Sequence, residues 1–181
     1  MYRIVLASFA TLVAGCTIGR RPPAAERRPG EVVSQAPNDS LQAEVLAEVR
    51  RYYSDLSARD WNAFSDHFWP GATLTTIRQP PGRPTPEVAV QSVPGFVAQA
   101  PRGPGSKPVF QERMTGAEVK LYRNLAQVWA RYTARFGDAT DVREWQGIDA
   151  LTLMKHEGRW RMVALAFTGL EGNVTDRRGA R

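Results

Sequence analysis

The sequence is poor in metal-binding and nucleophilic side chains. Its 181 residues include one cysteine, Cys16, and two histidines, His67 and His156. A single cysteine excludes a disulfide within the chain, and two distant histidines do not make the spacing of a zinc site. No serine or cysteine lies in the glycine-flanked turn that presents a hydrolase nucleophile. We therefore expect no catalytic nucleophile, no metal site and no cofactor.

Long apolar runs are also scarce, and the only one is residues 4–15, which follow Arg3. This run is too short to span a bilayer as a mature helix, but it has the length of a signal-peptide core. It ends in Val13-Ala14-Gly15-Cys16, which resembles the lipobox of bacterial lipoproteins. The resemblance implies a signal peptide at residues 1–15 and a lipid anchor, such as palmitate, on Cys16. A plain secretory signal that happens to contain a cysteine is the alternative.

The lipobox resemblance also gives an expected location. A lipidated Cys16 would hold the protein at a membrane of the cell envelope, facing the periplasm, because several acyl chains on one residue anchor stably. Thr17 stands where an aspartate would mark retention in the inner membrane, so the outer membrane is favoured over the inner.

The chain has little excess charge once its ends are set aside. The formal net charge is +6, but eight of the 24 basic residues and four of the 18 acidic residues lie outside residues 41–175, leaving that part at +2. A nucleic-acid-binding domain usually has a basic face of its own, so we expect no nucleic-acid partner. Residues 16–40, with prolines and arginines, are typical of a disordered tether, and residues 171–181 of a flexible basic tail.

Residues 41–76 organise the remaining domain, which we place at residues 41–170. Apolar residues recur on one face of a helix from Leu41 to Leu56, and Asp39 could cap its start. A second helix is expected after Asp60, ending before Pro70-Gly71. In that second segment, Asp66 and His67 are neighbours that point about 100° apart, so we interpret them as a half-exposed pair at a helix end rather than a catalytic dyad.

Strands are predicted at residues 72–78, 109–119, 121–136, 148–156 and 160–168. Turns are expected at residues 122–124 and 138–141 and at Glu157-Gly158. Residues 79–108 are rich in proline and are expected to form a loop interrupted by a short helix at residues 93–100. On the last strand, Trp160, Met162, Ala164 and Ala166 are predicted to share the inner face.

Helices followed by several long strands indicate an α+β domain. Residues 58–74 (ARDWNAFSDHFWPGATL), 124–136 (NLAQVWARYTARF) and 147–167 (GIDALTLMKHEGRWRMVALAF) resemble the nuclear transport factor 2-like superfamily, and most of all its SnoaL-like and lumazine-binding-like groups. The resemblance implies a cone-shaped, curved antiparallel sheet wrapped around N-terminal helices, with an apolar pocket inside. Because this fold hosts many functions, it does not imply one activity.

The resemblance also suggests site residues. Thr76 occupies the position of the basic aspartate of the superfamily's ketosteroid isomerases, and a threonine cannot abstract a carbon-bound proton near neutral pH. Isomerase chemistry of that kind is therefore not expected, and no catalytic residue is assigned. Asp149 lies near the position of the second acid, but one residue out of register, which would reverse its face. The expected ligand-binding residues are Tyr53, Trp69, Trp129, Tyr132 and Asp149.

Three functions remain open from the sequence. The first is a non-catalytic, lipid-anchored protein of the cell envelope that binds a small apolar ligand. The second is an enzyme acting on a small apolar or carbonyl substrate, which a cavity with paired, desolvated titratable groups would favour. The third is an interaction module that forms a homodimer through the outer face of its sheet.

Overall fold

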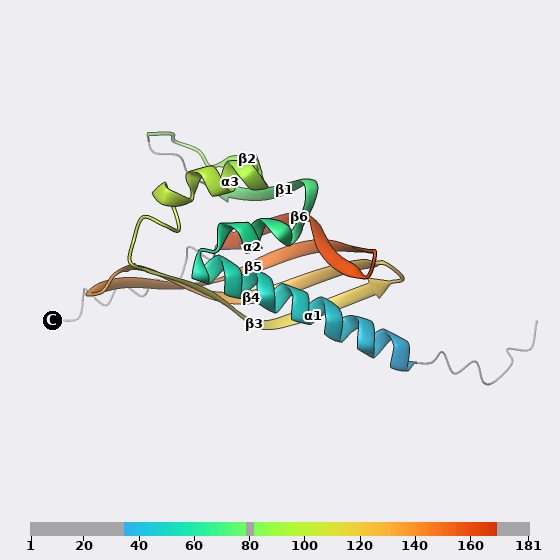
Figure 1. Ribbon diagram of the computed structural model, residues 1–181. Coiled ribbons are helices and arrows are strands. Elements are labelled where there is room, and N and C mark those ends of the chain that lie inside the picture. Colours follow the sequence, from blue (N-terminus) through green and yellow to red (C-terminus); the bar gives the residue numbers. More distant parts are fainter. Residues whose placement is uncertain (1–34, 79–81, 170–181) are drawn as a thin grey trace, which may run out of the picture. The chain divides into compact units, whose positions relative to one another are not determined.

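Residues 35–78 and 82–169 are described by the computed structural model. They form a six-stranded sheet with helices on one side (Figure 1). The elements are α1 (Gln35–Ala58), α2 (Trp61–Asp66), β1 (Phe68–Arg78), β2 (Glu87–Ser92), α3 (Val93–Gln99), the short 3-10 helix η1 (Ala100–Arg102), β3 (Val109–Tyr122), β4 (Leu125–Asp138), β5 (Asp141–His156) and β6 (Arg159–Gly169). The predicted signal peptide, Cys16 and basic tail lie outside the described residues.

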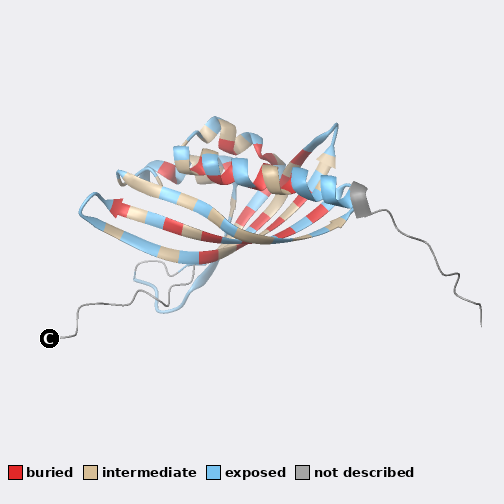
Figure 2. Ribbon diagram, turned by 90° about the horizontal axis from the view of Figure 1, so that it is seen from below, coloured by how far each residue is buried: buried red, intermediate tan, exposed pale blue. Residues whose placement is uncertain are grey.

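The strand order is β2-β1-β6-β5-β4-β3. Every neighbouring pair in this sheet is antiparallel except β1 and β6, which run parallel. The sheet curves, and α1 lies along its inner side (Figure 2). The expected α+β fold with a curved sheet around N-terminal helices is therefore confirmed, with one parallel pair in a sheet expected to be antiparallel.

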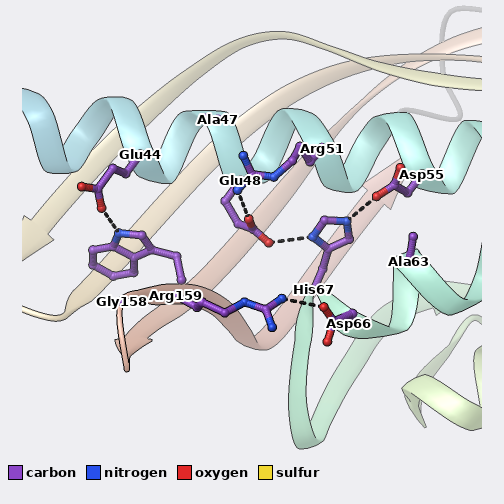
Figure 3. Close-up of a pocket in the computed structure, with 11 residues that line it drawn as sticks. Glu44, Ala47, Glu48, Arg51, Asp55, Ala63, Asp66, His67, Gly158 and Arg159 are labelled. Atoms are coloured by element: carbon purple, nitrogen blue, oxygen red, sulfur yellow. Dashed lines mark hydrogen bonds and ion pairs between the residues drawn. The ribbon is translucent and has the colours of Figure 1, made fainter.

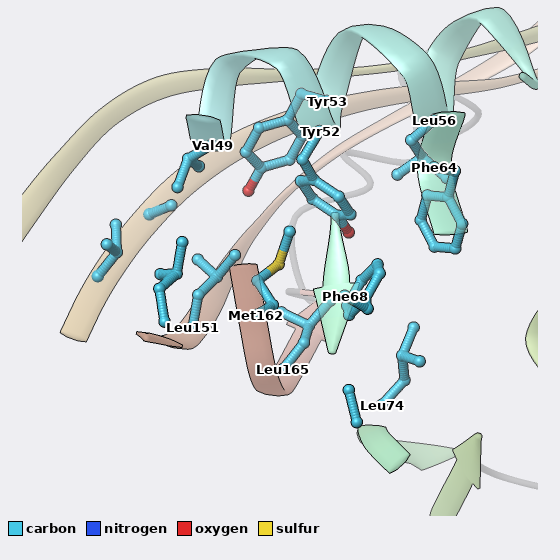
Figure 4. Packing of buried hydrophobic residues seen from close by; sticks show 14 of the residues in the cluster. Val49, Tyr52, Tyr53, Leu56, Phe64, Phe68, Leu74, Leu151, Met162 and Leu165 are labelled. Atoms are coloured by element: carbon cyan, nitrogen blue, oxygen red, sulfur yellow. The ribbon is translucent and has the colours of Figure 1, made fainter. Parts of the chain in front are cut away.

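Helix α1 begins six residues earlier than predicted, at Gln35. The last residues of the predicted tether therefore belong to the helix, and Asp39 lies within its first turns instead of capping it. The predicted apolar face is confirmed, because Val45, Val49 and Leu56 are buried. Figure 4 shows Val49 and Leu56 within the packed core. Within the described part of the chain, no helix has the length and apolar character needed to cross a membrane.

The second helix starts where the sequence indicates. The Asp60 carboxylate accepts a hydrogen bond from the backbone N–H of Ala63 at 3.0 Å and caps α2. The helix ends at Asp66, however, and β1 has already begun at Phe68, so Pro70 and Gly71 lie within an irregular stretch of this strand. This early start of β1 is what carries His67 inward beneath α1.

The proline-rich segment contains more structure than predicted. The short helix is confirmed as α3, and the Ser92 hydroxyl accepts a hydrogen bond from the backbone N–H of Gly95 at its start. Immediately before it, residues 87–92 form β2, an edge strand that the sequence prediction assigned to a loop. Strand β5 also begins seven residues earlier than predicted, at Asp141. Phe96 of α3 and residues 143–145 of the extended β5 line the large cavity of the domain.

A β-bulge in β6 overturns part of the predicted face assignment. Met162 pairs with Leu153 and Ala164 pairs with Thr152, so Val163 has no partner. The extra residue reverses the alternation of side chains beyond it. Trp160 and Met162 are buried as predicted, but the inner positions after the bulge belong to Leu165 and Phe167, not to Ala164 and Ala166. The bulge therefore places two large apolar side chains on the inner face.

Candidate functional site

A cavity of about 1110 Å³ opens between the inner face of the sheet and the helices. Its walls are mainly apolar and aromatic, and every layer of the domain contributes to them. These residues are Tyr52, Leu56, Leu74, Phe96, Phe110, Tyr132, Phe136, Trp145, Leu165 and Phe167. A large apolar cavity with a few convergent polar groups is the usual form of a small-molecule site. The polar groups therefore decide what this cavity can do.

Asp149 is the most buried acid at the cavity. It lies on β5, is 3% exposed, and accepts a hydrogen bond from the Tyr53 hydroxyl at 2.6 Å. Burial raises the pKa of Asp149 to about 7, although the hydrogen bond from Tyr53 acts in the opposite direction. Near neutral pH this carboxyl is therefore present in both its neutral and its charged form.

Glu112 is a second acid in the same cavity, and the sequence prediction missed it. Burial raises the pKa of Glu112 to about 8, and the nearby charge of Asp149 acts in the same direction. The Ser57 hydroxyl fixes its backbone, because it donates to the Glu112 carbonyl at 2.8 Å and accepts from the Glu112 N–H at 2.9 Å. A sequence signal existed: Phe110, Glu112 and Met114 alternate on one face of β3, which places an acid on an otherwise apolar face.

Tyrosine hydroxyls supply the remaining polar groups. Burial and the neighbouring acids raise the pKa of Tyr52, Tyr53 and Tyr132 above the ordinary value of 10.0, so all three keep their protons. The ring of Tyr132 lies against Gly147, where an added Cβ would come within 2.3 Å of the tyrosine Cζ atom. The glycine thus makes room for Tyr132 in the cavity wall.

The structure brings together three of the five predicted ligand-binding residues. Asp149 and Tyr132 line the cavity, and Tyr53 reaches Asp149 from α1. Trp69 is elsewhere: its indole N–H approaches the Met154 carbonyl at 3.4 Å, and the Arg161 guanidinium lies 5.2 Å from its ring centre. Trp129 is 53% exposed, because residues 127, 129 and 131 point to the outer face of β4.

Two expectations drawn from the family resemblance concern the same cavity. Thr76 lines it, as expected from its position on the first strand. Asp149 lies on the inner face of β5, so the apparent one-residue offset does not turn it away from the cavity. The cavity therefore has the acid of β5 and the phenol of α1 but no acid on β1.

A second, smaller cavity of about 450 Å³ lies along another face of α1. At its base, the His67 ring bridges two acids of α1, with Nδ1 2.6 Å from Glu48 and Nε2 2.8 Å from Asp55 (Figure 3). Burial alone would lower the pKa of His67, but the hydrogen bonds to Glu48 and Asp55 and the negative charges of these two acids together outweigh it and raise the pKa above 6.5. His67 is 7% exposed, so the predicted half-exposed pair is wrong for the histidine.

Asp66, the other member of that pair, is exposed and bonds Arg159 at 2.5 Å and Arg161 at 2.6 Å. Glu48 is buried although the helical pattern placed it on the polar face of α1, because His67 and Arg51 both contact its carboxylate. The acids and bases of this small cavity satisfy one another, and they fasten α1 to the start of β1. We therefore assign the functional site to the larger cavity.

No family model and no curated protein matches this chain. Several solved structures do. A nuclear transport factor 2-like protein with a cystatin-like fold from Novosphingobium aromaticivorans has 14% identity and a TM-score of 0.59, over 80% of this chain and 93% of that one. A proposed scytalone dehydratase from the same organism has 12% identity and a TM-score of 0.60, over 75% and 87%. A proposed dehydratase of this family from Streptomyces avermitilis has 11% identity and a TM-score of 0.59, over 75% and 99%.

Likeness at this level of identity shows the fold and not the activity. The described domain has the nuclear transport factor 2-like, cystatin-like fold that the resemblance implied.

Proposed function

We propose that this protein is held at the cell envelope by a lipid on Cys16 and that its domain binds a small, largely apolar molecule bearing a hydrogen-bond acceptor such as a carbonyl group. The observation that carries the proposal is the combination of an apolar cavity of about 1110 Å³ with two acids in its wall, the buried Asp149 and the partly buried Glu112. Apolar walls supply affinity for the body of the ligand, and the few polar groups fix its orientation.

The protonation state of the two acids determines which hydrogen-bond acceptor the ligand should carry. With pKa values of about 7 and about 8, Asp149 is partly protonated and Glu112 mostly protonated near neutral pH. A protonated carboxyl donates a hydrogen bond, whereas a carboxylate only accepts. The inner part of the cavity therefore offers donors without a full negative charge, and this suits a neutral carbonyl oxygen.

The fluorescent naphthyl ketone Prodan tests this proposal, because its emission shifts to shorter wavelength when its carbonyl loses a hydrogen bond. Binding should be tightest below about pH 7 and should weaken about tenfold by about pH 9, since both acids then lose the proton that they donate. The measurement is a titration of Prodan fluorescence against protein across this range. A dissociation constant and emission that do not change with pH would contradict the proposal.

Two variants of Asp149 separate the donor from the shape of the cavity. Asp149→Asn keeps an N–H donor that does not titrate, so Prodan binding should persist at high pH. Asp149→Leu removes the donor, so emission should shift to shorter wavelength already at low pH. Asp141→Asn, at the exposed start of β5, controls for the loss of one acid. If Asp141→Asn changed binding as much as Asp149→Leu, the assignment of Asp149 would fail.

The proposed anchor predicts that Cys16→Ser abolishes labelling by an alkynyl palmitate analogue and moves the protein from the membrane fraction to the soluble fraction. The reason is that the thiol is the acceptor of the lipid, and a serine hydroxyl does not replace it. Thr17→Ser changes the neighbouring residue and should keep both labelling and membrane association. Full labelling of the Cys16→Ser chain would refute the lipoprotein assignment.

Acid–base catalysis on a small carbonyl compound is a second candidate, favoured by one observation. The two acids have pKa values near neutral and face one cavity, so one could accept a proton while the other donates one. Some structural neighbours are named as dehydratases, which is compatible with this candidate. Incubation with a β,γ-unsaturated ketone under ultraviolet detection distinguishes the two functions, because binding alone leaves the absorbance change at the rate of the buffer.

A further inference from the structure

Two arginines lie on the exposed rim of the large cavity. Arg78 ends β1 and Arg143 lies near the start of β5, and both line the cavity. Because β1 is parallel to β6 and β6 is antiparallel to β5, the end of β1 and the start of β5 lie at the same edge of the sheet. Arg78 follows Thr76 and Arg143 precedes Trp145 by two residues, so both share the inner face with cavity residues.

Within residues 35–78 and 82–169, no acid forms an ion pair with either arginine. Glu87 lies opposite Arg78 on the neighbouring strand, but its carboxylate pairs with Arg83 at 3.7 Å. Other arginines of the domain do have such partners, including Arg135, which bonds Glu144 at 2.8 Å. Among the described residues, Glu144 is the one other acid on the cavity wall besides Glu112 and Asp149, and Arg135 already compensates its charge. The rim is therefore cationic.

The cavity consequently has two different ends. Its inner part offers Asp149 in partly uncharged and Glu112 in mostly uncharged form. Its rim offers two guanidinium groups that form no ion pair among residues 35–78 and 82–169. Between them lie apolar side chains such as Phe136, Trp145 and Phe167. Guanidinium groups favour carboxylate, sulfonate and phosphate oxygens, and partial removal from water at a cavity rim strengthens such contacts.

We infer that the ligand is an amphipathic anion: an apolar body inside the cavity, with an acidic group held at the rim by Arg78 and Arg143. This inference rests on the proposed binding function and narrows its ligand class. The chemistry is shared by carboxylic, sulfonic and phosphoric acids of apolar molecules. A neutral molecule of the same shape binds the same walls but lacks the contact with the arginines.

A matched pair of fluorescent probes tests the inference. N-phenylnaphthylamine is neutral, and anilinonaphthalene sulfonate has the same aromatic body with an added anionic group. For the double variant Arg78→Gln/Arg143→Gln, the dissociation constant of the sulfonate should rise about tenfold, while that of the neutral probe should change less than about twofold. Added salt should weaken sulfonate binding to the wild-type chain and have little effect on the neutral probe.

The control removes the same charge elsewhere. Arg50 on α1 and Arg113 on β3 are exposed and do not line the cavity, so Arg50→Gln/Arg113→Gln should leave both probes unaffected. Equal loss of sulfonate binding in the two double variants would overturn the inference, because it would show a response to net charge alone. Neutral-probe binding with no selective loss of the sulfonate would overturn the inference but leave the binding function standing. Failure of the wild-type chain to bind either probe would overturn both.

Discussion

Replacing Trp160 by alanine is expected to lower the free energy of unfolding by about 3–5 kcal/mol, the range for truncating a buried tryptophan. Trp160 is 4% exposed and shares the inner face of β6 with Met162, which is fully buried. Its indole N–H also donates to the Glu44 carboxylate at 3.2 Å. A loss of this size is a large fraction of the stability of a small domain, so the melting temperature should fall steeply.

Trp129→Ala is the matched control, because the same side chain is removed from the outer face of the sheet. Trp129 is 53% exposed, and its loss should change the free energy of unfolding by less than about 1 kcal/mol. Thermal or denaturant unfolding of both variants makes the comparison. Equal melting temperatures for Trp160→Ala and the wild-type chain would mean that the inner face of β6 is assigned incorrectly.

The alternation of apolar and polar residues was sufficient to identify the buried face of a strand where that alternation is regular. On β4, Ala126, Val128, Ala130 and Tyr132 alternate with more polar residues in the sequence, and all four are buried. The pattern failed on β6, because the bulge at Val163 shifts the alternation by one and nothing in residues 160–168 marks its position. The alternation on β4 already implied that Trp129 points outward. The prediction of Trp129 as a ligand-binding residue therefore contradicted the strand pattern.

The acids of the site show a different limit of prediction from the sequence. Asp149 could be nominated by resemblance, but its partner Tyr53 lies 96 residues away and only the fold brings the two together. His67 was placed half in water because its partners, Glu48 and Asp55, occupy the face of α1 that the helical period assigns to solvent. Local periodicity describes one element at a time, and these contacts depend on how α1, β1 and β5 are packed.

The same burial that prepares the cavity for a ligand should destabilise the folded domain as pH rises. The unfolded chain releases the proton of residue 149 near the ordinary value of 3.8, whereas the folded domain retains it to about pH 7. Between these values the unfolded state binds fewer protons, so the stability of the folded domain falls as pH rises through this window. Glu112 acts in the same direction between its ordinary value of 4.5 and about 8.

Asp149→Asn is therefore expected to stabilise the domain by about 2–4 kcal/mol near pH 8 and to have little effect below about pH 4. An amide does not ionise, so the variant escapes the cost of a buried charge, and its oxygen can still accept the hydrogen bond from Tyr53. Denaturant unfolding of both proteins at several pH values measures the difference. Asp141→Asn, at the exposed start of β5, should show no comparable gain. The contrary result would be an Asp149→Asn variant that is less stable than the wild-type chain near pH 8. Asp149 would then be a stabilising carboxylate. Glu112 alone would remain as a neutral hydrogen-bond donor in the cavity.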